Sequence, residues 1–250
     1  MKRKISKNDL LYLLPICIFL ALWEILGRIA QTPLFPPLSK VVVEFWLLLG
    51  KGVLLKSLGA SLARVLVGYS LGSLAGLFVG ILMGLNRVVE RSLSPLISIL
   101  FPIPTLGWLP LLMLWIGINE ALPVTLIFIC AFFPVAYNTV TGIKGVKEEY
   151  IKAARTLKAS SWFILWHVIL PMALPNIFTG LRLEAGMVWR TVIAAEMFAI
   201  STGIGALLIN AETLIRVDVI LVCLMLLSLM CSSFDRMFLW LEHKTTGAWR

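Results

Sequence analysis

Long apolar stretches separated by short polar segments dominate this sequence. Each stretch is about as long as the roughly 20 mostly apolar residues that an α-helix needs to cross a bilayer. The pattern therefore predicts an all-α, polytopic membrane protein. We expect six membrane-spanning helices, over residues 10–30, 58–85, 93–117, 122–143, 173–200 and 219–241.

The polar segments divide the chain into three parts: an N-terminal anchor helix with an outer segment (1–57), a transmembrane core (58–241) and a short tail (242–250). No small-residue cleavage site follows the first apolar stretch, so an uncleaved anchor is expected rather than a signal peptide. Residues 32–39 are proline-rich and predicted to be extended. Residues 40–57 are predicted to lie along the membrane surface as an amphipathic helix.

Composition and charge support this interpretation. The chain is 60% hydrophobic and 14% charged, with a mean hydropathy of +0.96 and a net charge of +9. Soluble domains are about half apolar and about 25% charged, so the excess apolar surface is expected to face lipid. With the N-terminus in the cytoplasm, most loop lysines and arginines fall on the cytoplasmic side. Both termini are thus predicted to be cytoplasmic, in the inner or plasma membrane, and the charge requires no nucleic-acid partner.

The second predicted span carries glycine at every fourth position. Residues four apart lie on one face of a helix, and glycine lets another backbone approach that face closely. We predict helix packing there, within the subunit or across a dimer, and a surface that slides during gating is the functional alternative. The glycines are Gly68, Gly72, Gly76, Gly80 and Gly84.

Prolines interrupt the third predicted span, most densely at Pro102 and Pro104. Proline removes a backbone donor, and such breaks persist in a membrane where other helices or a water-filled cavity satisfy the backbone. The segment 101–110 is therefore a candidate lining of a pathway, with a merely kinked structural helix as the alternative.

Charged residues cluster in the fifth predicted span, where they are costly and usually functional. Arg182 and Glu184 are expected near the cytoplasmic interface, where snorkelling explains them. Arg190 and Glu196 lie deeper and on different helix faces, so each needs a partner elsewhere. They are candidates for solute passage or gating, and a structural polar contact is the alternative.

The sequence shows no catalytic or cofactor-binding pattern. Its four cysteines, Cys17, Cys130, Cys223 and Cys231, lie in apolar stretches without metal or redox spacing and are expected to be small buried hydrophobes. No GxxxxGK[ST] phosphate-binding loop is present, so the chain is not expected to hydrolyse ATP or to bind a cofactor.

The polar segment 144–172 is too patterned to be a slack linker. Tyr150, Ala153, Ala154 and Leu157 have helical spacing and form one apolar stripe. A second short apolar stretch follows before Pro171. We predict a helical hairpin that docks against a partner, and contact with lipid headgroups alone is the alternative.

This loop resembles the EAA loop of binding-protein-dependent ATP-binding-cassette (ABC) permeases, which reads Glu-Ala-Ala, three residues, Gly, nine residues, Ile-x-Leu-Pro. Lys152 and Lys158 stand where the family has Glu and Gly, and Val168 replaces Ile. The matching residues are Ala153, Ala154, Leu170 and Pro171.

Further segments resemble the nitrate, sulfonate, taurine and bicarbonate branch of these permeases. They are PPLSKV (36–41), SLARVLVGYSLG (61–72), PLLMLWIGI (110–118), AFFPVAYNTVTGI (131–143), WRTVIAAEM (189–197) and GIGALL (203–208).

The resemblance implies a type I ABC importer permease fold and a subunit that is not itself an enzyme. Two permease copies, expected to be identical, would form the pathway for a small solute, an oxyanion or sulfonate by the branch. An external binding protein would deliver the solute. ATPase subunits carrying ATP-Mg would receive a loop helix at about 149–161. The implied coupling residues are Glu149, Tyr150, Lys152, Ala153, Ala154, Leu157, Lys158, Leu170 and Pro171.

Two other classes remain open from the residues. A secondary transporter or channel would need ionisable residues in several spans, whereas here they concentrate in the fifth. A membrane enzyme would need clustered His, Asp or Glu at one membrane face, and His167 and His243 are far apart in the chain.

Overall fold

The computed structural model describes residues 7–246, with side chains over 14–245, and all regular secondary structure in that part is helical. The elements are α1 (Lys7–Ala30), α2 (Leu38–Gly50), α3 (Val53–Leu85), α4 (Arg87–Leu100), η1 (Thr105–Trp108), α5 (Leu109–Ile116), α6 (Ala121–Lys144), α7 (Glu148–Thr156), α8 (Ser161–Ile164), η2 (Leu165–Ile169), α9 (Leu170–Ala199), α10 (Ile204–Thr213) and α11 (Val217–Thr246).

Four of the helices with described side chains are long and apolar enough to cross a membrane. A fifth span is reached if α4 and the η1–α5 segment count as one. The side chains of the first part of α1 are not described, so the predicted first span (10–30) stays a prediction. Helix α1 itself, with 24 residues, is long enough to cross a bilayer. The four spans are Val53–Leu85, Ala121–Lys144, Ser161–Ala199 and Val217–Thr245.

The second, third and fifth predicted spans differ from the structure, and the fifth begins at Ser161, within the loop segment, rather than at residue 173. The third span is not one kinked helix over 93–117, because α4 and the η1–α5 segment meet at 91° around the break that contains Pro102 and Pro104. The second span begins at Val53 rather than at residue 58. Helix α2 before it, predicted to lie along the membrane surface over 40–57, ends at Gly50, because Gly52 adopts a left-handed φ of +72° that few other residues tolerate.

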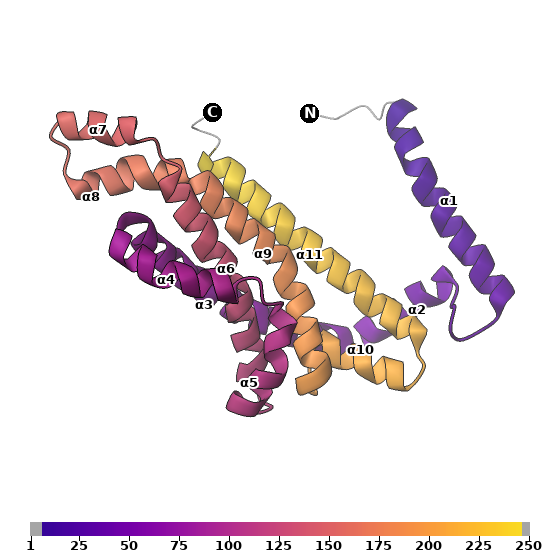
Figure 1. The fold of residues 1–250 in the computed structure, drawn as a ribbon. Coiled ribbons are helices and arrows are strands. Elements are labelled where there is room, and N and C mark those ends of the chain that lie inside the picture. The colour runs from indigo at the N-terminus through magenta and orange to yellow at the C-terminus, as the bar shows by residue number, and fades with distance from the viewer. Residues whose placement is uncertain (1–6, 247–250) are drawn as a thin grey trace.

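The helices α3, α6 and α9 form the centre of the molecule (Figure 1). The glycine stripe of α3 faces α6 within the same chain. A Cβ atom at Gly72 would lie 2.5 Å from the carbonyl oxygen of Phe128, and one at Gly76 would lie 2.6 Å from that of Phe132. All five glycines are this close to α6, so the two backbones are nearly in contact along several turns.

Helices α10 and α11 cover the other side of α9, whereas α1 stands apart (Figure 1). The start of α1, the end of α11, and α7 lie at the same end of the molecule, which we call the loop end. Local contacts tie α1 to the segment after it: Trp23 donates to the Pro36 carbonyl at 3.1 Å, and Glu24 accepts from the backbone N–H of Ser39 at 2.9 Å.

Substitution within the glycine stripe is expected to destabilise the fold. Gly72→Ala places a methyl group against the α6 backbone, which cannot move aside, and should lower the free energy of unfolding by about 1–3 kcal/mol. Thermal unfolding of the purified protein in detergent would measure this change.

Gly59→Ala is the matched control, because a Cβ at Gly59, also in α3, meets nothing within 4 Å. It should be neutral or should stabilise by about 0.5–1 kcal/mol. Equal effects of the two substitutions would contradict close packing of α3 on α6.

Candidate functional site

A cavity of about 420 Å³ lies beside the broken helix, between the 101–108 segment, α6 and α9. Its walls are mostly apolar and aromatic, and they include Phe101, Trp108 and Phe133. Both predicted prolines line it, so the break builds one wall of the cavity. The polar lining comes from Thr105, Cys130, Glu184, Arg190 and Thr191.

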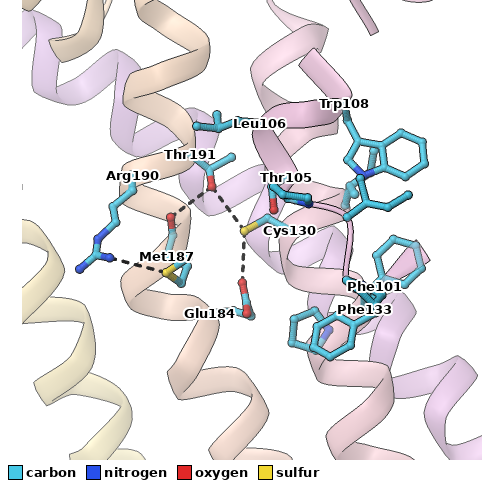
Figure 2. Close-up of a pocket in the computed structure, with 15 residues that line it drawn as sticks. Phe101, Thr105, Leu106, Trp108, Cys130, Phe133, Glu184, Met187, Arg190 and Thr191 are labelled. Atoms are coloured by element: carbon cyan, nitrogen blue, oxygen red, sulfur yellow. Dashed lines mark hydrogen bonds between the residues drawn. The ribbon is translucent and has the colours of Figure 1, made fainter. Parts of the chain in front are cut away.

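Glu184 lies at the midpoint of α9 and is 8% exposed, so snorkelling at the membrane interface does not explain it. Its carboxyl group lies 3.2 Å from the Cys130 thiol, which donates to it (Figure 2). The same sulfur is 3.4 Å from the Thr191 hydroxyl. A carboxyl, a thiol and a hydroxyl therefore meet at one wall of the cavity.

Arg190 borders the same cavity, but its side chain is exposed. Its guanidinium extends to the opposite side of α9 from the Glu184 carboxyl (Figure 2). There it contacts the Met187 sulfur at 3.9 Å and borders a second cavity, of about 490 Å³, between α9 and α11. Arg182 also lines that second cavity, where its Nε is 2.7 Å from Asp235 Oδ1.

Glu196 lies outside both cavities, in a buried polar network far from the loop end. Its side chain is fully buried, and its carboxylate is 2.6 Å from Nη1 of Arg64 on α3. It also accepts from the Ser61 hydroxyl at 2.8 Å and from the Gly205 backbone N–H at 3.0 Å. These donors offset the cost of burying the charge.

Glycines allow the start of α10 to reach this carboxylate. Gly203 has a φ of +109°, and a Cβ there would lie 2.3 Å from the carboxyl carbon of Glu196. A Cβ at Gly205 would lie 2.2 Å from the Ile193 carbonyl oxygen. The segment WRTVIAAEM supplies the carboxylate of Glu196, and the segment GIGALL supplies the N-terminus of α10. A carboxylate at a helix N-terminus is electrostatically favourable.

Arg64 extends the network to the loop before α6. Its Nε and Nη2 bind the two carboxylate oxygens of Glu120 at 2.7 and 2.8 Å, and its Nη1 donates to the Thr202 carbonyl at 2.9 Å. Glu120 is 70% exposed, and the Arg64 guanidinium holds the pKa of its carboxyl below the ordinary value. One arginine therefore connects α3, α9 and two loops.

At the loop end, α7 is shorter than the predicted helix at 149–161. It ends at Thr156, and a separate helix begins at Ser161, whose preceding residue Ser160 caps it by accepting from the Phe163 N–H. Ile151 and Ala154 turn inward onto η2 and the start of α9, whereas Ala153 is exposed.

The outer face of α7 carries large side chains: Tyr150 is 49% exposed and Leu157 is 84% exposed. The predicted stripe is thus divided between an inner and an outer face. The charged residues are also exposed, and the Lys152 ammonium, 3.0 Å from Glu148, lowers the pKa of that carboxyl.

Lys158 explains why the turn after α7 favours glycine. Its φ is +58°, in the left-handed region where a side chain is disfavoured by about 1–2 kcal/mol. Its N–H donates to the Arg155 carbonyl at 2.9 Å, and that of Ala159 donates to Ala154 at 3.1 Å. The chain keeps the turn although the residue is lysine.

Residues 72–247 match the model of the binding-protein-dependent transport system inner membrane component. The chain belongs to this permease family. The permease is 39% identical to an ABC transporter permease protein of Methanocaldococcus jannaschii, over 89% of this chain and 86% of the relative. It is 36% identical to the taurine transport system permease of Escherichia coli, over 87% and 82%. Sulfonate, bicarbonate and nitrate permeases are among its relatives, which confirms the predicted branch.

The fold is that of type I ABC importer permeases. A crystal structure of an amino acid ABC transporter superposes with a TM-score of 0.65 at 21% identity, covering 79% of the permease and 96% of that chain. The predicted fold class is thereby confirmed.

The structure separates the residues proposed for pathway or gating. Pro102, Pro104 and Arg190 border the cavity at the broken helix, whereas Glu196 belongs to the network with Arg64. Glu184 was missed as a cavity residue. The signal was present, because a carboxyl at the middle of an apolar helix is a functional candidate wherever it lies.

Removing the arginine of the buried network should be far more damaging than removing its exposed partner. Arg64→Gln leaves the Glu196 carboxylate uncompensated and should lower stability by about 3–5 kcal/mol. Glu120→Gln should cost less than about 1 kcal/mol, because that end of the pair is exposed. Thermal unfolding in detergent measures both.

The double variant Arg64→Gln/Glu196→Gln tests the cause of the loss. Two neutral amides leave no buried charge, so it should be more stable than Arg64→Gln alone. A double variant as unstable as the sum of the single variants would show that the charges do not interact.

Restoring glycine at the turn should stabilise the loop. Lys158→Gly relieves the left-handed strain and should slow hydrogen exchange of the α7 amides, equivalent to about 0.5–1 kcal/mol. Lys147→Gly is the control, because Lys147 has a φ of −62° and no strain to relieve. Faster exchange in Lys158→Gly would contradict the assignment.

Proposed function

We propose that this chain is the membrane-spanning subunit of an importer in which separate ATPase subunits, carrying ATP-Mg, dock on α7. The observation that carries the proposal is the outer face of α7, where Tyr150, Ala153 and Leu157 are exposed at the tip of the loop. Exposed apolar residues gathered on one face mark an interaction site. The inner face packs on η2, which belongs to the span Ser161–Ala199, so a force applied to α7 reaches that span.

A second copy of the permease is proposed to complete the pathway. The face of α9 with Thr179, Leu183, Met187 and Arg190 is exposed in the single chain. An arginine facing lipid at that depth is costly, so protein or a water-filled pathway is expected to cover it. A homodimer joined around this face satisfies that requirement, and an external binding protein then delivers solute at the end opposite the loop.

The loop end is proposed to be cytoplasmic, in the cell membrane. The start of α1, α7 and the end of α11 share this end. Arg87, Lys144, Lys147, Lys152 and Arg155 also lie in the segments there, in line with the positive-inside rule. Both termini are therefore assigned to the cytoplasm.

The solute is proposed to be a small oxyanion or sulfonate. The support is the permease's similarity to relatives named for taurine, sulfonate, bicarbonate and nitrate transport. A self-contained secondary transporter or channel is the competing function, and it requires no ATPase.

Purification with this chain as bait from mildly solubilised membranes tests the assignment. An ABC ATPase at near-equal amount is expected. A partner-free permease, under conditions in which a known ABC complex survives, would overturn the proposal in favour of the self-contained transporter.

Ala153→Arg is expected to disrupt docking without unfolding the permease, because the residue points outward and the new charge meets the ATPase. ATP-dependent uptake should fall at least about tenfold. This is the effect of losing roughly 1.4 kcal/mol of binding free energy between permease and ATPase when the ATPase does not saturate the permease. Uptake and the amount of co-purified ATPase are the measurements.

Ser92→Arg is the control, since it adds the same charge at an exposed position on α4, outside α7. Ala154→Arg should instead reduce the stability of the loop, because Ala154 packs inward. Normal uptake and normal ATPase recovery in Ala153→Arg would place the docking surface elsewhere.

A further inference from the structure

The carboxyl group of Glu184 is poorly matched to its surroundings. It is buried at the middle of a membrane span, and among the described residues its one hydrogen-bonding contact is the Cys130 thiol. A thiol is a weak donor. The nearby Tyr69 hydroxyl donates to the Leu181 carbonyl instead, at 2.8 Å.

Glu196 shows what a structural carboxylate requires in this fold. On the same helix, it receives a guanidinium, a hydroxyl and a backbone N–H, and it does not line either of the two cavities described above. Glu184 has no such set of donors, and its side chain lines a cavity. A buried carboxyl that packing does not satisfy is a binding-site candidate.

The rest of the cavity wall has the chemistry that accompanies a carboxylate in cation recognition. Phe101, Trp108 and Phe133 line it, and aromatic faces attract organic ammonium groups. The volume of about 420 Å³ lies within the range of small-molecule sites. Arg190 also borders the cavity, but its guanidinium extends to the other side of α9, and among the described residues no ion pair joins it to Glu184.

We propose that this cavity is a subsite for the cationic nitrogen group of a small organic solute, with Glu184 as its counter-ion and the aromatic residues as its walls. The inference rests on the proposed transport function and narrows its solute. An amino-sulfonate carries such a group, whereas a bare inorganic oxyanion does not and would be repelled by the carboxylate.

Cys130 provides a reporter inside the subsite. In a variant that retains Cys130 alone (Cys17→Ser, Cys223→Ala, Cys231→Ser), the thiol is treated with trimethylammonioethyl methanethiosulfonate or with the anionic sulfonatoethyl reagent. In each case the thiolate sulfur forms a disulfide and methanesulfinate leaves. The ratio of the two rates, normalised to that for free mercaptoethanol, reports the local charge and cancels changes in thiol reactivity.

The assembled complex is expected to favour the cationic reagent by about tenfold or more, because Glu184 lies next to the thiol. Glu184→Gln should reduce the normalised ratio to near one, and Glu184→Asp should retain most of the preference. Thr191→Val is the matched control, since it removes an uncharged polar neighbour of Cys130 without changing charge, and it should leave the ratio unchanged.

Equal rates for the two reagents, or a preference that survives Glu184→Gln, would overturn the subsite. So would a Cys130 that neither reagent modifies during ATP turnover, because a solute cavity must open to water. Co-purified ATPase is measured in the same samples. If the protein with Glu184 intact shows no charge preference while the ATPase is present, the subsite alone is refuted, whereas absence of the ATPase refutes the importer function.

Discussion

Close contact between α3 and α6 is the constraint on which the other features depend. Apolar side chains supply little driving force between helices in lipid, so association relies on backbones that approach closely. The glycine stripe of α3 provides this approach over several turns. Once α6 is fixed, Cys130 and Phe133 face the cavity at the broken helix, and α3 brings Arg64 within reach of α9.

The two carboxyl groups of α9, those of Glu184 and Glu196, differ in how many hydrogen-bond donors the packed helices provide to them. Two elements supply the donors to Glu196: α3 provides the Ser61 hydroxyl and the Arg64 guanidinium that also binds Glu120, and the start of α10 provides the Gly205 N–H. Satisfying the charge thus joins parts of the chain that would otherwise separate. Glu184 is buried against α6 but lies beside the broken helix, where a cavity adjoins its side chain. A fully paired acid stabilises the fold, and a weakly paired acid next to a cavity is suited to a ligand.

Some of these features follow from the sequence because they are local. Glycine at every fourth residue predicts close helix packing, and two prolines separated by one residue predict a break. The apolar residues of the polar loop have helical spacing. The pairing of Arg64 with Glu196 was not predictable, because the residues lie 132 positions apart and the sequence does not specify which faces meet. The spacing of Ala153 and Ala154 fits either face of α7, and only packing on η2 decides between them. At Lys158 the backbone requirement for glycine is hidden, since another residue occupies the position.

Helix α9 connects the polar loop to both buried carboxyl groups. Residues 161–199 run from the loop, through the π-helical turn at η2, to both carboxyl groups, and α7 packs on η2. A π-turn is a less regular part of a helix and is often found at functional sites, so the irregular segment lies where the loop contacts the span. Beyond it, α9 is helical through Glu184 to Glu196. The contact of α7 with η2 lies at the loop end of this helix, and the Arg64 network fixes its other end. Under the proposed docking of a partner on α7, the part of α9 near the loop is therefore the part that the network with Arg64 constrains least.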